Sequence, residues 1–267
     1  MGIVVITMPG ESKRSLVQAL SQATGGRVDL VIIQNVQPKV RKGLLFRLNE
    51  IWRHPSHIKH LWYSVLLRCA PMLRSKLKYF REFSSYPKED GYTAPVVFVD
   101  DINSDTAYEA IRKAQPDLVV VRGSRILSPR LISAAPKVIN LHMGYCPYYR
   151  GTLANQCAVL DGAYEHIGAT IHYVAEKVDA GDVIEIVTPD LRLPPQELFR
   201  KLNDDAMRAL VSVAKRILQG EDLPSTQQVF GGGKNLLLRQ WTPELRWKTA
   251  LRLLAWERNG IPMKRAF

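Results

Sequence analysis

The chain has 267 residues, of which 46% are hydrophobic, so it is long enough for one large globular domain with a real core. Its three cysteines form no CxxC pair and no evident disulfide framework, and no stretch is apolar and long enough to span a bilayer. The net charge is +12, which favours anionic partners. The start of the chain has no basic leader, which predicts a cytoplasmic protein, at most peripheral to the inner membrane surface.

Short apolar runs alternate with segments of helical periodicity along most of the chain. Strands are expected at residues 3–7, 29–34, 95–100, 118–121, 138–141, 169–174 and 183–187. Helices are expected around 16–20, over 106–114, 129–134, 152–161 and 195–218, and near 246–256. This alternation predicts an α/β fold of Rossmann-like type, a mostly parallel sheet with helices on its faces.

A basic segment at about 39–90 interrupts the alternation and is predicted to be a helical insertion. Between 39 and 81 it has eleven Lys and Arg residues against one acid, so it carries about +10. Its apolar residues have the spacing of amphipathic helices, which leaves open a solvated lid, a tether, a homodimer contact, or a surface for a membrane, a partner or an anionic substrate. His54, His57 and His60 are evenly spaced, but a proline interrupts them and no thiol or acidic ligand accompanies them, so no metal site is predicted.

The most informative segment is Asn140–Gly151, with the sequence NLHMGYCPYYRG. Asn140 and His142 are two residues apart at the end of a predicted strand, so their side chains point to the same face. Asp179 follows about forty residues later, in a predicted tight turn. An amide, an imidazole and a carboxylate together can stabilise an oxyanion and move a proton without a metal. Cys146 lies inside the segment, but this set needs no covalent step.

These motifs resemble the folate-dependent formyltransferase family. The resemblance rests on Asn-x-His with the following Pro-x-Tyr-Arg-Gly, on GATIH at 168–172, on VDAGDVI at 178–184 and on PDLVVVRGSRILS at 116–128. It covers roughly residues 92–220 and, more weakly, the first 35. It implies the formyltransferase fold, with residues 1–220 as the catalytic domain and 221–267 as a short basic C-terminal extension. Met143–Pro147 differs from the commoner Ser-Leu-Leu-Pro of the family.

The resemblance implies transfer of a formyl group from N10-formyltetrahydrofolate to a primary amine. Asn140 would donate to the oxyanion, His142 would hold a proton near it, and Asp179 would orient His142 and accept the amine proton. The pterin would be received by Arg125, Ile126, Leu127 and Val178. The acceptor would meet Gly10, Tyr149 and Arg150. Mid-strand His172 is expected to be structural, and Asp182 is the neighbour most easily mistaken for Asp179.

The acceptor is expected to be a small, phosphate-bearing amine, first of all a nucleotide-linked amino sugar. Gly10 alone makes a poor phosphate loop, which argues against glycinamide ribonucleotide. The residues after Gly220 are too few for the C-terminal barrel of methionyl-tRNA formyltransferase, so nucleic acid is disfavoured, although the basic insertion keeps it open. Hydrolysis of formyltetrahydrofolate is a second enzymatic alternative. A non-catalytic module that binds a membrane surface or a protein is the third.

Overall fold

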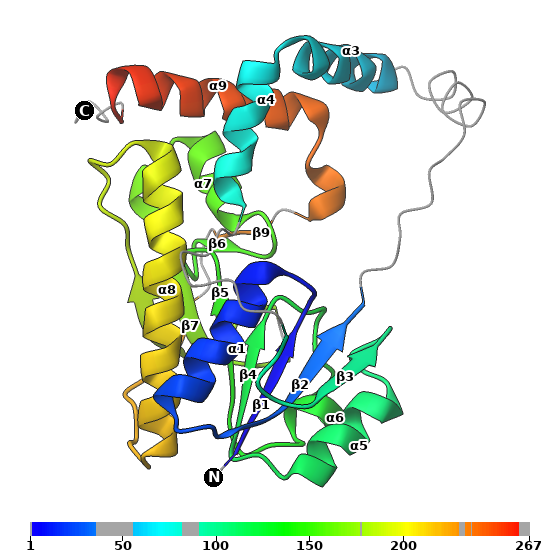
Figure 1. Ribbon diagram of the computed structural model, residues 1–267. Coiled ribbons are helices and arrows are strands. Elements are labelled where there is room, and N and C mark those ends of the chain that lie inside the picture. The colour runs from blue at the N-terminus through cyan, green and yellow to red at the C-terminus, as the bar shows by residue number, and fades with distance from the viewer. Residues whose placement is uncertain are drawn as a thin grey trace.

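The computed structural model describes residues 2–35, 56–81, 91–176, 178–229, 233–235 and 237–261. These residues form a seven-stranded sheet with helices on both faces, and the strand order is β3-β2-β1-β4-β5-β7-β8 (Figure 1). The strands are β1 (Ile3–Thr7), β2 (Val28–Gln34), β3 (Val96–Val99), β4 (Leu118–Arg122), β5 (Val138–His142), β7 (Ala169–Tyr173) and β8 (Val183–Val187). The helices are α1 (Glu11–Ala23), α3 (Ser56–Cys69), α4 (Pro71–Lys76), α5 (Asp105–Ala114), α6 (Pro129–Ile132), α7 (Ala154–Asp161), α8 (Pro195–Leu218) and α9 (Pro243–Asn259).

The first five strands of this sheet run parallel, and β7 and β8 are added antiparallel at one edge. The predicted mostly parallel α/β fold is therefore confirmed. Because β1, β2, β4 and β5 share one direction, their last residues lie along the same edge of the sheet. This carboxyl edge is where open α/β sheets bind their ligands.

The sheet is buried on both faces, as the apolar runs predicted. Along β1, Ile3 and Val5 join the core under α1 and α8, whereas Val4 and Ile6 face the core under α5 and α6. Strand residues alternate between faces, so each apolar strand supports both layers. Figure 1 shows α8 running along the sheet beside α1, with α5 and α6 at the lower right, on the opposite face of the sheet.

The described part of the predicted insertion, residues 56–81, forms α3, α4 and the 3₁₀ helix η1 (Leu77–Phe80). The remainder of this prediction, residues 39–55 and 82–90, lies outside the described residues. Helix α9 packs across α3, α4 and α7, and Lys59 forms a 2.8 Å ion pair with Glu244 of α9. The insertion and the C-terminal segment thus form one helical layer beyond the carboxyl edge of the sheet (Figure 1).

Helix α3 turns an apolar stripe to solvent. Ile58, Leu61, Trp62 and Val65 are each at least 42% exposed and follow helical spacing. The predicted membrane or partner surface at 39–81 stays a prediction. None of the described helices is long and apolar enough to cross a membrane.

Two short strands missed by the sequence analysis make a second sheet. β6 (Tyr149–Arg150) pairs in parallel with β9 (Lys234–Asn235). The pairing ties the loop after β5 to the segment that leads into α9. Loop 143–151 is therefore held between the main sheet and the C-terminal segment.

Candidate active site

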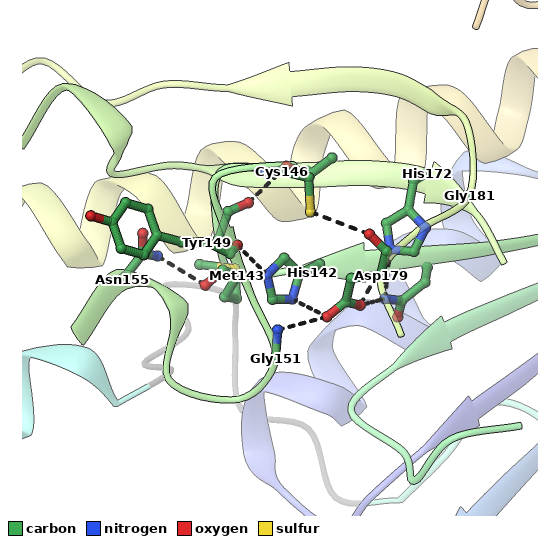
Figure 2. A network of polar contacts seen from close by, with 12 residues as sticks. His142, Met143, Cys146, Tyr149, Gly151, Asn155, His172, Asp179 and Gly181 are labelled. Carbon is green, nitrogen blue, oxygen red and sulfur yellow. Dashed lines mark hydrogen bonds and ion pairs between the residues drawn. The ribbon is translucent and has the colours of Figure 1, made fainter. Parts of the chain in front are cut away.

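The end of β5 and the turn between β7 and β8 bring the three predicted catalytic residues together. Asn140 and His142 lie on β5, and Asp179 lies in the turn. The Asp179 carboxylate accepts from the Gly151 amide at 2.9 Å and lies 3.3 Å from both Asn140 Nδ2 and His142 Nδ1 (Figure 2). Asn140, His142 and Asp179 thus form one contiguous polar cluster at the carboxyl edge.

The turn that carries Asp179 has an unusual backbone. Asp179 has φ of 48°, in the left-handed region that Asp and Asn tolerate better than most residues. A Cβ at Gly181 would lie 1.8 Å from the carbonyl oxygen of Tyr173, so no side chain fits there. The side-chain amide of Gln228 donates to the carbonyls of Asp179 and Gly181 at 3.0 and 2.6 Å. The Asp-x-Gly motif is therefore a geometric requirement, and the C-terminal segment helps hold it.

The ionisation of Asp179 and His142 follows from burial and mutual contact. Burial would raise the pKa of Asp179, but His172, His142 and the Gly151 amide outweigh it and hold that pKa well below its usual range. Burial lowers the pKa of His142 below its usual value, although the Asp179 carboxylate acts in the opposite direction. At neutral pH the cluster therefore combines an ionised carboxylate with a neutral imidazole.

His172 contacts this cluster, and its predicted structural role stays a prediction. The antiparallel register of β5 and β7 sets His172 opposite Asn140, and its Nε2 lies 3.1 Å from Asn140 Nδ2 and 3.4 Å from Asp179 Oδ1. Its Nδ1 lies 2.7 Å from the carbonyl of Tyr173, which can only accept. His172 therefore donates at Nδ1 to this carbonyl, and its Nε2 faces both the Asn140 amide and the Asp179 carboxylate. The GATIH motif contained this residue, but only the strand register shows its position.

The loop after His142 is braced by two buried polar side chains. Thr170 accepts from the Cys146 amide at 3.1 Å and donates to the Gly144 carbonyl at 2.7 Å. Asn155 of α7 donates to the Met143 and Gly168 carbonyls at 3.1 and 3.0 Å, and accepts from the Gly168 amide at 3.0 Å (Figure 2). These bonds fix the backbone that follows the catalytic candidates, and the sequence analysis missed both residues.

Gly144 accounts for part of the departure from the commoner Ser-Leu-Leu-Pro. A Cβ at this position would lie 2.3 Å from His142 Nε2, 2.3 Å from Ala154 Cβ and 2.8 Å from the Tyr149 carbonyl. In this chain the loop passes so close to the imidazole that only glycine fits. The backbone at Gly144 therefore packs directly against His142, Ala154 and the Tyr149 carbonyl, where the serine of the commoner motif would not fit.

Cys146 is buried with its Sγ 3.7 Å from the carbonyl of Asp179. Burial first, and then the Asp179 charge, raises the pKa of this thiol to about 12. The thiolate is the nucleophilic form of cysteine. Cys146 therefore packs as a neutral side chain at neutral pH, in line with the expectation that it forms no covalent intermediate.

The predicted pterin loop follows β4 at the same edge of the sheet. The amide of Arg125 donates to Gln34 Oε1 at 3.0 Å, Ile126 is 61% exposed, and Leu127 is buried. The Nε2 atom of Gln34 is buried without a hydrogen-bond partner among the described atoms. Val178 is half-buried next to Asp179.

The residues predicted to meet the acceptor lie on two separate segments and differ in burial. Exposed Gly10 precedes α1 at the end of β1. Nearby Lys13 has its pKa lowered to about 7 by burial and then by the charge of Arg122. Tyr149 is buried, and its hydroxyl donates to Asp161 at 2.9 Å. Arg150 lies on β6 directly before Gly151, whose amide donates to the Asp179 carboxylate.

The histidines of the insertion form no metal centre in the described part of the chain. No group of three or more His, Cys, Asp or Glu among the described residues could hold a metal ion. The side chains of His54 and His57 lie outside the described residues.

Residues 99–213 match the formyl transferase family. The matched segment includes β5, the loop after it and the Asp179 turn. A methionyl-tRNA formyltransferase from Bacillus mycoides is 33% identical over 137 residues, which cover 50% of this chain and 43% of that protein. The enzyme of the same name from Halalkalibacterium halodurans is 29% identical over 160 residues, 58% of this chain and 50% of that protein. The chain therefore spans about half the length of the curated relatives it matches.

Solved structures of formyltransferases share the fold over most of the chain. The phosphoribosylglycinamide formyltransferase of Anaplasma phagocytophilum has a TM-score of 0.54 and 20% identity, covering 89% of this chain and 98% of that chain. An N-formyltransferase of Helicobacter canadensis, in complex with folinic acid and dTDP-3-aminofucose, has a TM-score of 0.54 and 11% identity, covering 99% and 85%. A sugar N-formyltransferase from a Shewanella species has a TM-score of 0.51 and 15% identity, covering 95% and 88%. The predicted formyltransferase fold and family resemblance are both confirmed.

Proposed function

Because residues 99–213 match the formyl transferase family, we propose that the chain transfers a formyl group from N10-formyltetrahydrofolate to a primary amine. The observation that carries this proposal is the contact of Asn140 and His142 with the Asp179 carboxylate at the carboxyl edge of the sheet. The folate supplies the formyl carbon, and the pterin would lie against Arg125, Ile126, Leu127 and Val178. We assign residues 1–220 to the catalytic domain and 221–267 to a C-terminal extension.

Asn140 is suited to stabilise the oxyanion that forms when an amine attacks the formyl carbon. Its amide nitrogen contacts His172 Nε2 at 3.1 Å and Asp179 Oδ1 at 3.3 Å. A developing oxyanion accepts more strongly than the neutral formyl oxygen from which it forms, so a donor at Asn140 favours the charged intermediate over the bound substrate. Loss of one preorganised donor of this kind typically lowers the rate by about 10²–10³.

His142 is suited to hold a proton for part of the reaction. Its Nδ1 lies 3.3 Å from the Asp179 carboxylate, and its Nε2 lies 3.2 Å from the Tyr149 carbonyl. Both ring nitrogens therefore face acceptors, although burial favours the neutral ring. An imidazolium would have both N–H groups satisfied, so His142 can take up a proton transiently and return it to the leaving nitrogen.

For the acceptor we propose a nucleotide-linked amino sugar. Structures of the same fold include sugar N-formyltransferases, which supports this choice. Methionyl-tRNA is the second candidate, because the curated relatives with 32–33% identity carry that name. Water as acceptor would make the protein a hydrolase with the same cluster.

An activity assay with matched variants tests the proposal. Conversion of 10-formyltetrahydrofolate is followed with nucleotide-linked amino sugars, glycinamide ribonucleotide and methionyl-tRNA, and with no amine added. Asp179→Asn is expected to lose activity at least 10²-fold, whereas Asp182→Asn, at an exposed neighbour, stays within about twofold. Turnover that is independent of any amine would replace transfer by hydrolysis. A wild-type protein that neither binds nor converts the folate would refute both activities.

A further inference from the structure

A cavity of about 300 Å³ lies between the insertion and the C-terminal segment. One wall comes from α4, η1 and the residue that follows η1. The other comes from Trp241 and from Arg246 in the first turns of α9, and Gln156 of α7 closes it. Cavities of this volume are at the lower end of the range that binds small molecules.

Four basic side chains line this cavity, and no acidic residue in the described part of the chain does: Arg74, Lys78, Arg81 and Arg246. Two acids of α9 pair with lysines outside the cavity. Glu244 pairs with Lys59 and Lys248 at 2.8 Å each, and Glu257 pairs with Lys76. Four like charges around one cavity repel one another, and a bound anion with several charges would relieve this repulsion.

A smaller cavity of about 80 Å³ continues from the basic cavity toward the catalytic cluster. The two share Phe80, Arg81 and Gln156 as lining residues. The smaller one is also lined by Met143, which follows His142, and by Thr152, which follows Gly151. The smaller cavity therefore extends from the basic cavity to the loop that follows His142.

We propose that the basic cavity binds the diphosphate of a nucleotide-linked acceptor and that the smaller cavity leads the acceptor amine to Asn140, His142 and Asp179. The inference rests on the proposed function and specifies the acceptor's anionic part. Guanidinium groups bind phosphate oxygens in a bidentate manner, and three of the four cations are arginines. Trp241 and Phe80 add aromatic faces for a nucleobase.

The position of the cavity in the sequence agrees with a role in acceptor choice. Of its lining residues only Gln156 falls within the family match at 99–213. The cluster that handles the formyl group lies inside the match, whereas the basic cavity is built by segments outside it. Its small volume favours a nucleoside diphosphate over a nucleic acid, which would bind along an extended surface.

Calorimetric titration with UDP and with inorganic pyrophosphate tests the inference directly, without folate present. Wild-type protein is expected to bind UDP with a Kd in the micromolar range that rises with salt. Arg246→Glu should weaken UDP at least tenfold. Arg258→Glu, on the last turn of the same helix and outside the cavity, should change Kd less than twofold. Circular dichroism and binding of a 10-formyltetrahydrofolate analogue verify that each variant is folded.

The outcomes separate this inference from the proposed function. Binding of the folate analogue without binding of UDP or pyrophosphate at millimolar concentration would overturn the cavity assignment and leave formyl transfer standing. Equal losses in Arg246→Glu and Arg258→Glu would overturn it as well, because the effect would then be one of net charge. UDP binding that is lost only in Arg246→Glu supports the cavity assignment, whether or not the folate analogue binds. If the folate analogue does not bind the wild-type protein, that result counts against formyl transfer. An RNA oligonucleotide that binds more tightly than UDP, and is weakened by Arg246→Glu, would replace the diphosphate by nucleic acid.

Discussion

Gly144→Ala adds one methyl group beside the imidazole of His142. The new Cβ would lie 2.3 Å from His142 Nε2 and 2.3 Å from Ala154 Cβ, both far inside van der Waals contact. The Tyr149 carbonyl, 2.8 Å away, blocks a simple shift of the loop. The loop is also held through Thr170 and the Gly144 carbonyl. The substitution therefore has to displace His142, helix α7 or strand β6.

Two magnitudes follow, one for stability and one for rate. Overpacking a close-packed interior by a methyl group typically costs about 1–3 kcal/mol of the free energy of unfolding. A displacement of about 1 Å in a catalytic group lowers the rate on the order of 10²-fold. We expect Gly144→Ala to fold, to lose about 1–3 kcal/mol of stability, and to lose about 10²-fold in kcat.

A second substitution separates the two effects. Ala154→Gly removes the Cβ of α7 that the new Cβ at position 144 would meet, but leaves the collision with His142. Ala154→Gly alone, at the start of α7, costs about 1 kcal/mol through helix propensity. The double variant should be more stable than the sum of the single effects predicts, with kcat still reduced about 10²-fold. Denaturant unfolding and steady-state kinetics measure both. Wild-type kcat in Gly144→Ala would refute the close approach of the loop to the imidazole.

Three other substitutions test the cluster and its support. Asp179→Asn keeps a residue that tolerates positive φ, and removing the carboxylate should lower the pKa of His142 further, as followed by NMR titration. Because the pKa of Asp179 is depressed on folding, this carboxylate contributes to stability above about pH 4, and the contribution is lost as the pH falls below it. Asp179→Asn should therefore reduce the dependence of the free energy of unfolding on acidic pH. Asn155→Leu leaves Gly168 without its side-chain partner and should destabilise the fold by about 2–4 kcal/mol in urea unfolding. Cys146→Ala should keep kcat within about threefold, since the raised pKa of the thiol keeps it neutral; a complete loss of turnover in a folded protein would contradict this.

Local patterns predicted the elements that depend on local periodicity. Helix α8 was expected at 195–218 and spans Pro195–Leu218, because its apolar stripe is long and a proline marks its start. Asn140 and His142 could be paired because side chains two apart on a strand share a face. Helix α9 begins earlier than expected, at Pro243, because Thr242 caps it by accepting from the Leu245 amide at 3.3 Å.

Features that depend on pairing between distant segments could not be predicted. His172 enters the cluster only through the antiparallel register of β5 and β7, and that register has no signal in a single strand. Gln228 supports the Asp179 turn from 49 residues away. The β6–β9 pair consists of two residues in each strand, too short for any periodic pattern to be detected.

The same distinction explains why the reaction is easier to infer than the acceptor. The candidate catalytic residues lie between Asn140 and Asp179, on neighbouring strands and one turn, so their motif spacing already implies proximity. The basic cavity joins residues 74–81 to residues 241–246, and it exists because α9 packs across α3 and α4 and holds Lys59 through Glu244. A cavity that depends on the docking of two helices can change its ligand without altering the catalytic cluster. Differences in acceptor among proteins of this fold are therefore expected in such outlying segments, where a shared motif carries no information about the substrate.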